Sequence, residues 1–163
     1  MKRIGLLSDT HGFVNPRVFS FFSNCDEIWH AGDIGNIEAF EKLSAFKPIR
    51  AVYGNIDGGS LRIELQEYEI FTVEGLTVAM THIGGYPGRY SPMGKHIIQK
   101  YKPGLFISGH SHILKVIPDK KNNLLHINPG ASGNSGIHRQ ITLIKFEISE
   151  GVINNMEVSD TPR

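Results

Sequence analysis

Near its amino terminus the chain reads Gly5-Leu6-Leu7-Ser8-Asp9-Thr10-His11-Gly12. The apolar residues before Ser8 predict a short buried strand, and Gly12 predicts a turn soon after it. In an extended chain, residues two apart project to the same side, so Asp9 and His11 can direct a carboxylate and an imidazole to a common point. We interpret this pair as two candidate metal ligands at the end of the first strand.

Four later segments repeat this arrangement of an apolar run followed by a side chain that can bind metal, usually beside a glycine. They are His30-Ala31-Gly32-Asp33, Tyr53-Gly54-Asn55-Ile56-Asp57, Met80-Thr81-His82 and Ser108-Gly109-His110-Ser111-His112. Taken singly, Asp33 could cap a helix, Asn55 could turn the chain, and a histidine at a strand end is usually a hydrogen-bonded structural residue. The five segments together favour a metal site built from the ends of several strands.

The composition is typical of a soluble globular protein, with 163 residues, 40% of them hydrophobic and 20% charged. This length predicts a single domain, residues 1–163, without a separate cap domain. A net charge of +1 argues against a broad nucleic-acid-binding surface but leaves room for a small anionic ligand. The lone Cys25 excludes an intramolecular disulfide and a thiolate metal site.

The apolar run before Ser8 is too short for a signal peptide or a membrane span, so we expect a cytoplasmic protein that has no membrane partner. The apolar and aromatic content permits a homo-oligomer.

The order of elements predicts an α/β fold. Residues 3–53 read as strand, helix, strand, helix, strand, with helices beginning near Asn15-Pro16 and Asn36, which is typical of right-handed parallel crossovers. Ligands in such sheets lie beyond the carboxyl ends of the strands. Residues 68–80, 115–127 and 140–158 read as antiparallel hairpins, and residues 93–101 as a helix. We expect two mixed sheets that face each other with helices outside, and a glycine-rich loop, residues 84–92, beside His82.

The ordered set of Asp-x-His, Gly-Asp, Gly-Asn-x-Asp, Thr-His and Gly-His-x-His resembles the calcineurin-like metallophosphoesterase superfamily, and within it the short single-domain phosphodiesterases of bacteria and archaea. The resemblance covers residues 1–133 and implies a four-layer α-β-β-α sandwich with two divalent metal ions. It implies that one ion takes Asp9, His11, Asp33 and His112, and that the other takes Asp33, Asn55, His82 and His110. The residues by themselves supply this inventory but leave the division between the two ions open.

The ligand set consists of carboxylate, amide and imidazole groups, which suit Mn, Ni, Fe, Co and Zn, and we expect manganese first. The resemblance implies that a hydroxide bridging the two ions attacks a small phosphate ester directly, with no phosphoenzyme. It also implies that Asp33, Asn55 and His82 serve catalysis as well as metal binding. His30, Asp57 and Arg89 are further candidates, either to steady the ligands or to contact substrate, whereas we interpret His96, His126 and His138 as ordinary residues.

The third motif differs from that of many members of this superfamily. Those members carry a histidine after the Gly-Asn pair, and this histidine helps to protonate the leaving group. Here Ile56 stands at that position and cannot donate a proton. A general acid contributes typically ~10²- to 10⁴-fold, so its loss favours leaving groups of low pKa. We therefore hypothesise that activated or cyclic phosphodiesters are better substrates than alkyl phosphomonoesters.

A phosphomonoesterase is one alternative to the phosphodiesterase, and two further functions also compete with it. One is a non-catalytic scaffold, because a retromer subunit of this fold binds partner proteins; seven competent ligand side chains favour the enzyme instead. The other is a nuclease or protein phosphatase of the same superfamily, which the near-neutral charge and the short chain disfavour.

Overall fold

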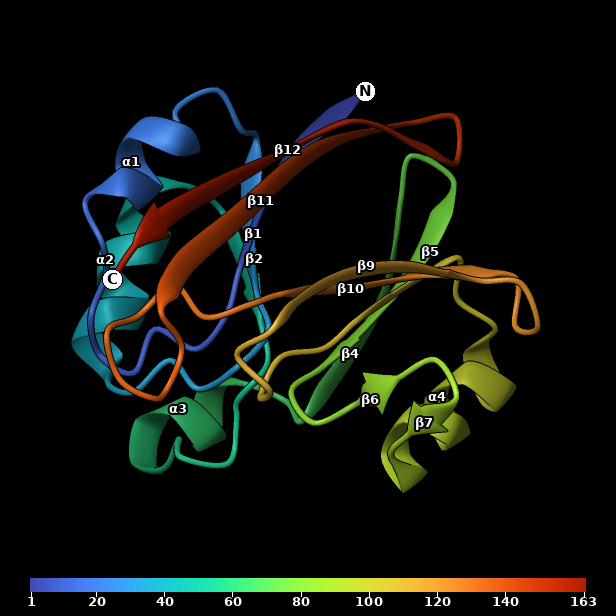
Figure 1. The fold of residues 1–163 in the computed structure, drawn as a ribbon, viewed down its shortest axis with the longest axis horizontal. Coiled ribbons are helices and arrows are strands. Elements are labelled where there is room, and N and C mark those ends of the chain that lie inside the picture. The colour runs from blue at the N-terminus through green and yellow to red at the C-terminus, as the bar shows by residue number, and fades with distance from the viewer.

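The computed structural model describes all 163 residues. Two five-stranded mixed sheets face each other, and helices lie on their outer faces (Figure 1). The first sheet has the order β12-β11-β1-β2-β3, with the strands β1 (Lys2–Leu7), β2 (Glu27–His30), β3 (Ile49–Ala51), β11 (Gln140–Ser149) and β12 (Val152–Pro162). The second has the order β4-β5-β8-β10-β9, with the strands β4 (Tyr68–Val73), β5 (Leu76–Thr81), β8 (Leu105–Ile107), β9 (Leu114–Asp119) and β10 (Leu124–Pro129).

The remaining elements are the helices α1 (Arg17–Phe21), α2 (Ile37–Phe46), α3 (Gly59–Glu64) and α4 (Pro92–Tyr101), and a small hairpin of β6 (Gly85–Tyr86) and β7 (Arg89–Tyr90). One apolar cluster joins α1 and α2 to the first sheet, and another joins α4 to the second. These layers confirm the expected α-β-β-α sandwich (Figure 1). None of the helices combines the length and hydropathy that crossing a membrane requires.

Helices α2 and α4 begin where the sequence places a capping side chain. Asn36 Oδ1 accepts a hydrogen bond from the backbone N–H of Ala39 at the start of α2. Ser91 caps α4 in the same way, with Pro92 at the first helical position. Asn15 accepts from the N–H of Arg17, so α1 begins slightly later than the sequence predicts.

The main core lies between the two sheets and contains 15 buried apolar residues, among them Trp29 of the first sheet and Met80 of the second. Every residue of β2 and β8 is buried, as expected for central strands covered on both faces. At about 25 cal/mol per Å² of apolar surface, this burial is the dominant stabilising term. The core therefore holds the central strands, and with them their carboxyl ends, in fixed positions.

The parallel strands bring the sequence motifs to one edge of the molecule. β1, β2 and β3 run parallel to one another, as do β5, β8 and β10. The motifs that begin at Asp9, Asp33, Asn55, His82 and His110 each follow the carboxyl end of one strand, namely β1, β2, β3, β5 and β8. This is the placement that the sequence predicts for a site in a parallel sheet.

Three local features differ from the sequence interpretation. Helix α3 was not anticipated, because it is short and its cap, Gly58, has no side chain to signal it. Within the expected loop at residues 84–92, the chain forms the β6–β7 hairpin. The hairpin expected at residues 115–127 extends further, because Asn128 and Pro129 of β10 still pair with β9.

Candidate metal centre

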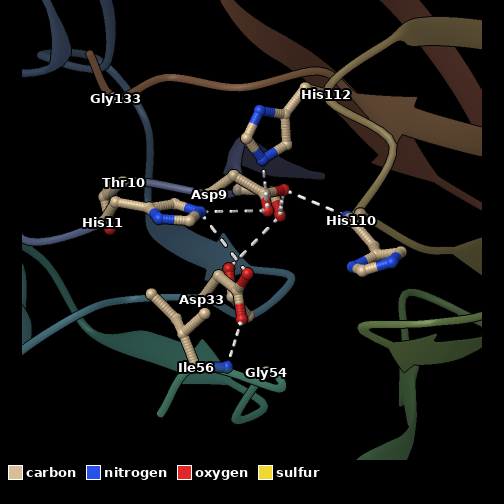
Figure 2. Close-up of polar contacts among 12 residues, drawn as sticks. Asp9, Thr10, His11, Asp33, Gly54, Ile56, His110, His112 and Gly133 are labelled. Carbon is tan, nitrogen blue, oxygen red and sulfur yellow. Dashed lines mark hydrogen bonds and ion pairs between the residues drawn. The ribbon is translucent and has the colours of Figure 1, made fainter. Parts of the chain in front are cut away.

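Asp9 presents one carboxylate oxygen to the protein and the other to a group of imidazoles (Figure 2). Its Oδ2 accepts hydrogen bonds from the Ser8 hydroxyl at 2.6 Å and from the backbone N–H of His110 at 3.1 Å. Its Oδ1 lies 3.2 Å from Nε2 of His112 and 3.8 Å from Nε2 of His11. One oxygen is thus anchored, and the other is free to bind a cation.

Asp33 is arranged in the same way at the end of β2. Its Oδ1 accepts a hydrogen bond from the backbone N–H of Ile56 at 3.1 Å (Figure 2). Its Oδ2 lies 3.2 Å from Nε2 of His82 and 3.4 Å from Nε2 of His11. Asp33 therefore stands between imidazoles that come from the first and fourth motifs.

Three buried atoms at this point have no hydrogen-bond partner: Asp9 Oδ1, His11 Nε2 and His82 Nε2. Nδ1 of His82 lies 2.8 Å from the carbonyl of Ala31, which can only accept, so in the neutral ring Nε2 carries a lone pair. A lone pair that faces two carboxylates is unfavourable unless a cation lies between them. The donor set and its unpartnered atoms therefore fit a divalent metal ion.

The charges of these groups depend on one another. Burial alone would raise the pKa of Asp9, but the imidazoles of His11 and His112 outweigh it and hold that pKa far below its usual range. Burial is likewise outweighed at Asp33, whose pKa is lowered mainly by His82. The pKa of His11 is raised by Asp9, and that of His82 is raised, against burial, by Asp33. The site thus favours anionic carboxylates with positive charge between them.

The candidate ligand atoms fall into two groups, within each of which all atoms lie within 4.8 Å of one another. The first contains Asp9, His11 and His112, and the second contains Asp33, His82 and His110. Asn55 lies beside the second group, with its Oδ1 3.1 Å from Nδ1 of His110. The structure thus brings together all seven residues that the sequence singles out: Asp9, His11, Asp33, Asn55, His82, His110 and His112.

Five of these seven residues have left-handed backbone conformations, with φ between +49° and +73°: Asp9, His11, Asp33, His110 and His112. A non-glycine residue in this region costs about 1 kcal/mol or more, and such residues cluster at functional sites. In this backbone conformation each side chain is directed toward the centre of the site shortly after its strand ends.

Two glycines allow the motifs to approach this closely. A Cβ on Gly54 would collide with the side chain and backbone of Asp33, and one on Gly109 would collide with the side chains of Ser8 and Asp9. Glycine is required at these positions because a ligand from another motif occupies the space of its missing side chain.

The three supporting candidates have different positions. His30 is fully buried; its Nδ1 accepts from Gly32 N–H and its Nε2 contacts the Thr10 hydroxyl at 3.0 Å, and burial lowers its pKa to about 4. It therefore steadies the loops and is shielded from substrate. Asp57 is also buried, and its carboxylate accepts hydrogen bonds from the backbone N–H groups of Ile34, Gly35 and Gly54. Arg89 is exposed on β7 and lines a cavity beside His110.

Sequence reasoning missed His138, whose ring lies against that of His112 with centroids 5.1 Å apart. It comes from an irregular segment before β11 that has no recognisable motif. No pattern of apolar residues indicates that this segment returns to the site, so only the three-dimensional structure identifies it.

Two cavities flank the second ligand group. One, of about 300 Å³, is lined by Asn55 and His82 and by the side chain of Arg62. The other, of about 230 Å³, is lined by His110, Arg89 and Lys115. Space is therefore available next to two members of the second ligand group, His82 and His110.

Comparison with known proteins agrees with this site. Residues 1–151 match the calcineurin-like phosphoesterase superfamily domain. A probable metallophosphoesterase of Methanocaldococcus jannaschii is 31% identical over 134 residues, which are 78% of this chain and 67% of that protein.

Two solved structures share the fold. One, from a structural and functional characterisation of a novel archaeal phosphodiesterase, has a TM-score of 0.76 at 20% identity and covers 96% of this chain and 99% of its own. The other, wild-type Vps29 of Entamoeba histolytica complexed with zinc, has a TM-score of 0.72 at 16% identity over 98% of both chains. At these identities the two structures establish the architecture alone. The match over residues 1–151, with the motifs at the ends of their strands, shows that this chain belongs to the calcineurin-like phosphoesterase superfamily.

Proposed function

We propose that this phosphoesterase-family protein is a phosphodiesterase that hydrolyses small phosphate esters with the aid of two divalent metal ions. The observation that carries the proposal is the group of unpartnered buried atoms, Asp9 Oδ1, His11 Nε2 and His82 Nε2, which face one another at the ends of three strands. Burying such atoms without partners costs several kcal/mol, so their convergence supports a cation-binding role.

The proposed ligand sets follow the two groups. Asp9, His11 and His112 would hold one ion, and His82, His110 and Asn55 the other, with Asp33 next to both. Manganese is our first choice, and Ni, Fe, Co and Zn suit the same ligands. When bound, two such ions neutralise phosphate charge and lower the pKa of water enough to supply hydroxide near neutral pH.

Two features favour a diester over a monoester substrate. Two cavities, one lined by His82 and the other by His110, offer room for two ester arms on one phosphate. The side chain of Ile56, beside Asn55, has no proton to donate, which favours esters whose leaving group is stable as an anion. In the proposed reaction, water adds to phosphorus, one P–O ester bond breaks, and the released alcohol takes its proton from solvent.

The scaffold alternative rests on the likeness to Vps29, which establishes the fold alone at 16% identity. A scaffold needs neither unpartnered buried imidazoles nor five strained backbones around them. We therefore place the enzyme first.

The test compares paired aryl phosphodiester and aryl phosphomonoester substrates with metal-stripped protein to which Mn, Ni, Co, Zn or Mg is returned. We expect a transition metal to restore diesterase activity, and Asp33→Asn to abolish it and to weaken metal binding measured by calorimetry. Asp160→Asn, at an exposed carboxylate in β12, is the matched control. If the fully loaded protein hydrolyses neither ester, the enzyme proposal is wrong and the scaffold takes its place.

A further inference from the structure

The cavity of about 230 Å³ beside His110 lies between the β6–β7 hairpin and the second sheet. The hairpin contributes Tyr86 and Arg89, β9 contributes Lys115, and β10 contributes His126. Because His110 belongs to the second candidate ligand group, a substrate phosphate held there could extend one ester arm directly into this cavity.

The cavity carries positive charge that the protein does not neutralise. Arg89 and Lys115 line it, and none of its lining residues is acidic. The lysine and arginine side chains that do form ion pairs in this structure are Arg3, Arg50 and Lys145. Lys115 Nζ lies 3.6 Å from the centre of the Tyr86 ring, which holds the ammonium group on the cavity wall. Two unpaired cations on one small cavity attract an anionic group.

His126 belongs to the wall of this cavity, but it is fully buried, and its Nε2, which has no partner within the protein, is not accessible to solvent. A ligand in the cavity therefore meets Arg89 and Lys115 rather than this imidazole.

The cavity of about 300 Å³ beside Asn55 and His82 lacks this uncompensated charge. Its cation, Arg62, donates to the backbone carbonyl of Asp57, and the carboxylate of Glu67 lines the same cavity. The positive charge of this cavity is therefore balanced, and the two cavities differ in the ester arm that they suit.

We propose that the cavity formed by Tyr86, Arg89, Lys115 and His126 binds one ester arm of the substrate, and that this arm carries a second anionic group. Arg89 and Lys115 bind the anion. This inference rests on the proposed function, because the arm must extend from a phosphate at the metal centre.

The test uses metal-loaded full-length protein and p-nitrophenyl phosphodiesters whose second arm is propyl, 3-phosphonopropyl or 3-trimethylammoniopropyl. We expect wild-type kcat/KM to be highest for the phosphonate arm and lowest for the ammonium arm. Lys115→Met or Arg89→Met should lower the ratio of phosphonate-arm to propyl-arm kcat/KM by about tenfold, since a hydrogen bond to a charged group is lost. Lys121→Met, at an exposed lysine that lines a different cavity, should leave this ratio unchanged.

The outcomes separate this inference from the proposed function. Hydrolysis of all arms at equal rates, or an equal fall for every arm in Lys115→Met and Arg89→Met, would overturn the anion site and leave the diesterase in place. If no diester is hydrolysed, the proposed function fails, and calorimetry with propane-1,3-bisphosphonate still tests the cavity. Binding that is weakened in Lys115→Met and unchanged in Lys121→Met would support the anion site, whereas equal binding in both would overturn it.

Discussion

The ring of His138 supports the ring of His112, with their Nδ1 atoms 3.2 Å apart. The other nitrogen of His138, Nε2, lies 2.8 Å from the carbonyl of Gly133 and must donate to it. Nδ1 of a neutral His138 is therefore an acceptor, and His112 donates to it from its own Nδ1. This leaves the lone pair of His112 on Nε2, which lies 3.2 Å from Asp9 Oδ1. The chain of contacts selects the tautomer of His112 that can bind a metal ion.

We predict that His138→Ala weakens metal binding by about 10- to 100-fold, the range typical for residues that orient a metal ligand. The expected cause is that His112 is no longer held in one tautomer and one ring orientation. Calorimetric titration of the metal-stripped protein with Mn measures the effect directly.

Two further variants serve as the control and the rescue for this prediction. His96→Ala, at an exposed histidine of α4, should leave metal affinity unchanged. His138→Gln, whose side-chain oxygen can accept from His112, should recover part of the loss. Equal affinity in wild type and His138→Ala would show that the contact between the rings has no role in metal binding.

Asp57 holds two loops of the site together through three backbone hydrogen bonds. Its carboxylate accepts hydrogen bonds from the N–H groups of Ile34 at 3.1 Å, Gly35 at 2.8 Å and Gly54 at 2.8 Å. Asp57 is only 3% exposed. Asp57→Ala would leave these donors without partners, so we predict a loss of about 3 kcal/mol or more in the free energy of unfolding. Urea denaturation of the metal-free protein measures this change.

The matched control for Asp57 is Glu41→Ala, at an exposed position of α2. We expect its free energy of unfolding to stay within about 0.5 kcal/mol of the wild type. A similarly small change in Asp57→Ala would mean that water or another side chain takes over the three backbone donors.

The fold was predictable because its signals are local. Asn36 marks the start of α2 by its capping side chain, and the apolar run that becomes β8 marks a central strand. The motifs gathered at one edge because parallel strands end at a common edge. The candidate ligand residues could thus be named from the sequence, although their side-chain directions could not.

The parts that were not predicted depend on contacts distant in sequence. Asp57 was a candidate to steady the ligands, but its backbone partners, 23 and 22 positions away, could not be identified from the sequence. His138 reaches His112 across 26 residues without any periodic pattern. His126 follows the strand alternation of β10 and shows its unpartnered nitrogen only when the surrounding residues are placed. Tertiary packing, rather than local propensity, decides these roles.

The buried ring of His126 makes folding stability depend on pH. Burial lowers its pKa in the folded protein from 6.5 to about 4. Between these values the unfolded chain binds a proton that the folded protein does not, so stability is lost as pH falls from about 6.5 toward 4. Wild type should lose up to about 3 kcal/mol more than His126→Phe across this window.

The measurement is urea denaturation between pH 4 and 7 in the presence of a chelator, so that metal release does not contribute. The pKa of His30 is lowered to about 4 by burial as well, so a slope of the same sign should persist in His126→Phe. Parallel curves for the two proteins would show that His126 does not titrate as its burial implies.

Substitution of Ile56 offers a gain-of-function test of the proposed preference for phosphodiesters with good leaving groups. Its side chain is 46% exposed, and its backbone N–H donates to Asp33 Oδ1, a bond that does not depend on the side chain. Ile56→His therefore adds an imidazole next to Asn55 without emptying any part of the core. We predict that turnover of alkyl phosphodiesters rises by about tenfold or more, because the new imidazolium can protonate the departing alkoxide.

Aryl esters provide the internal comparison for this variant. Turnover of p-nitrophenyl esters should change little, since p-nitrophenolate leaves without a proton, and the alkyl activity should gain a pH dependence set by the new imidazole. Ile56→Gln, which adds polarity without an acidic proton, should reproduce neither effect. If the alkyl and aryl rates rise together, or if glutamine matches histidine, proton donation is not the missing function, and the preference for good leaving groups must originate elsewhere in the site.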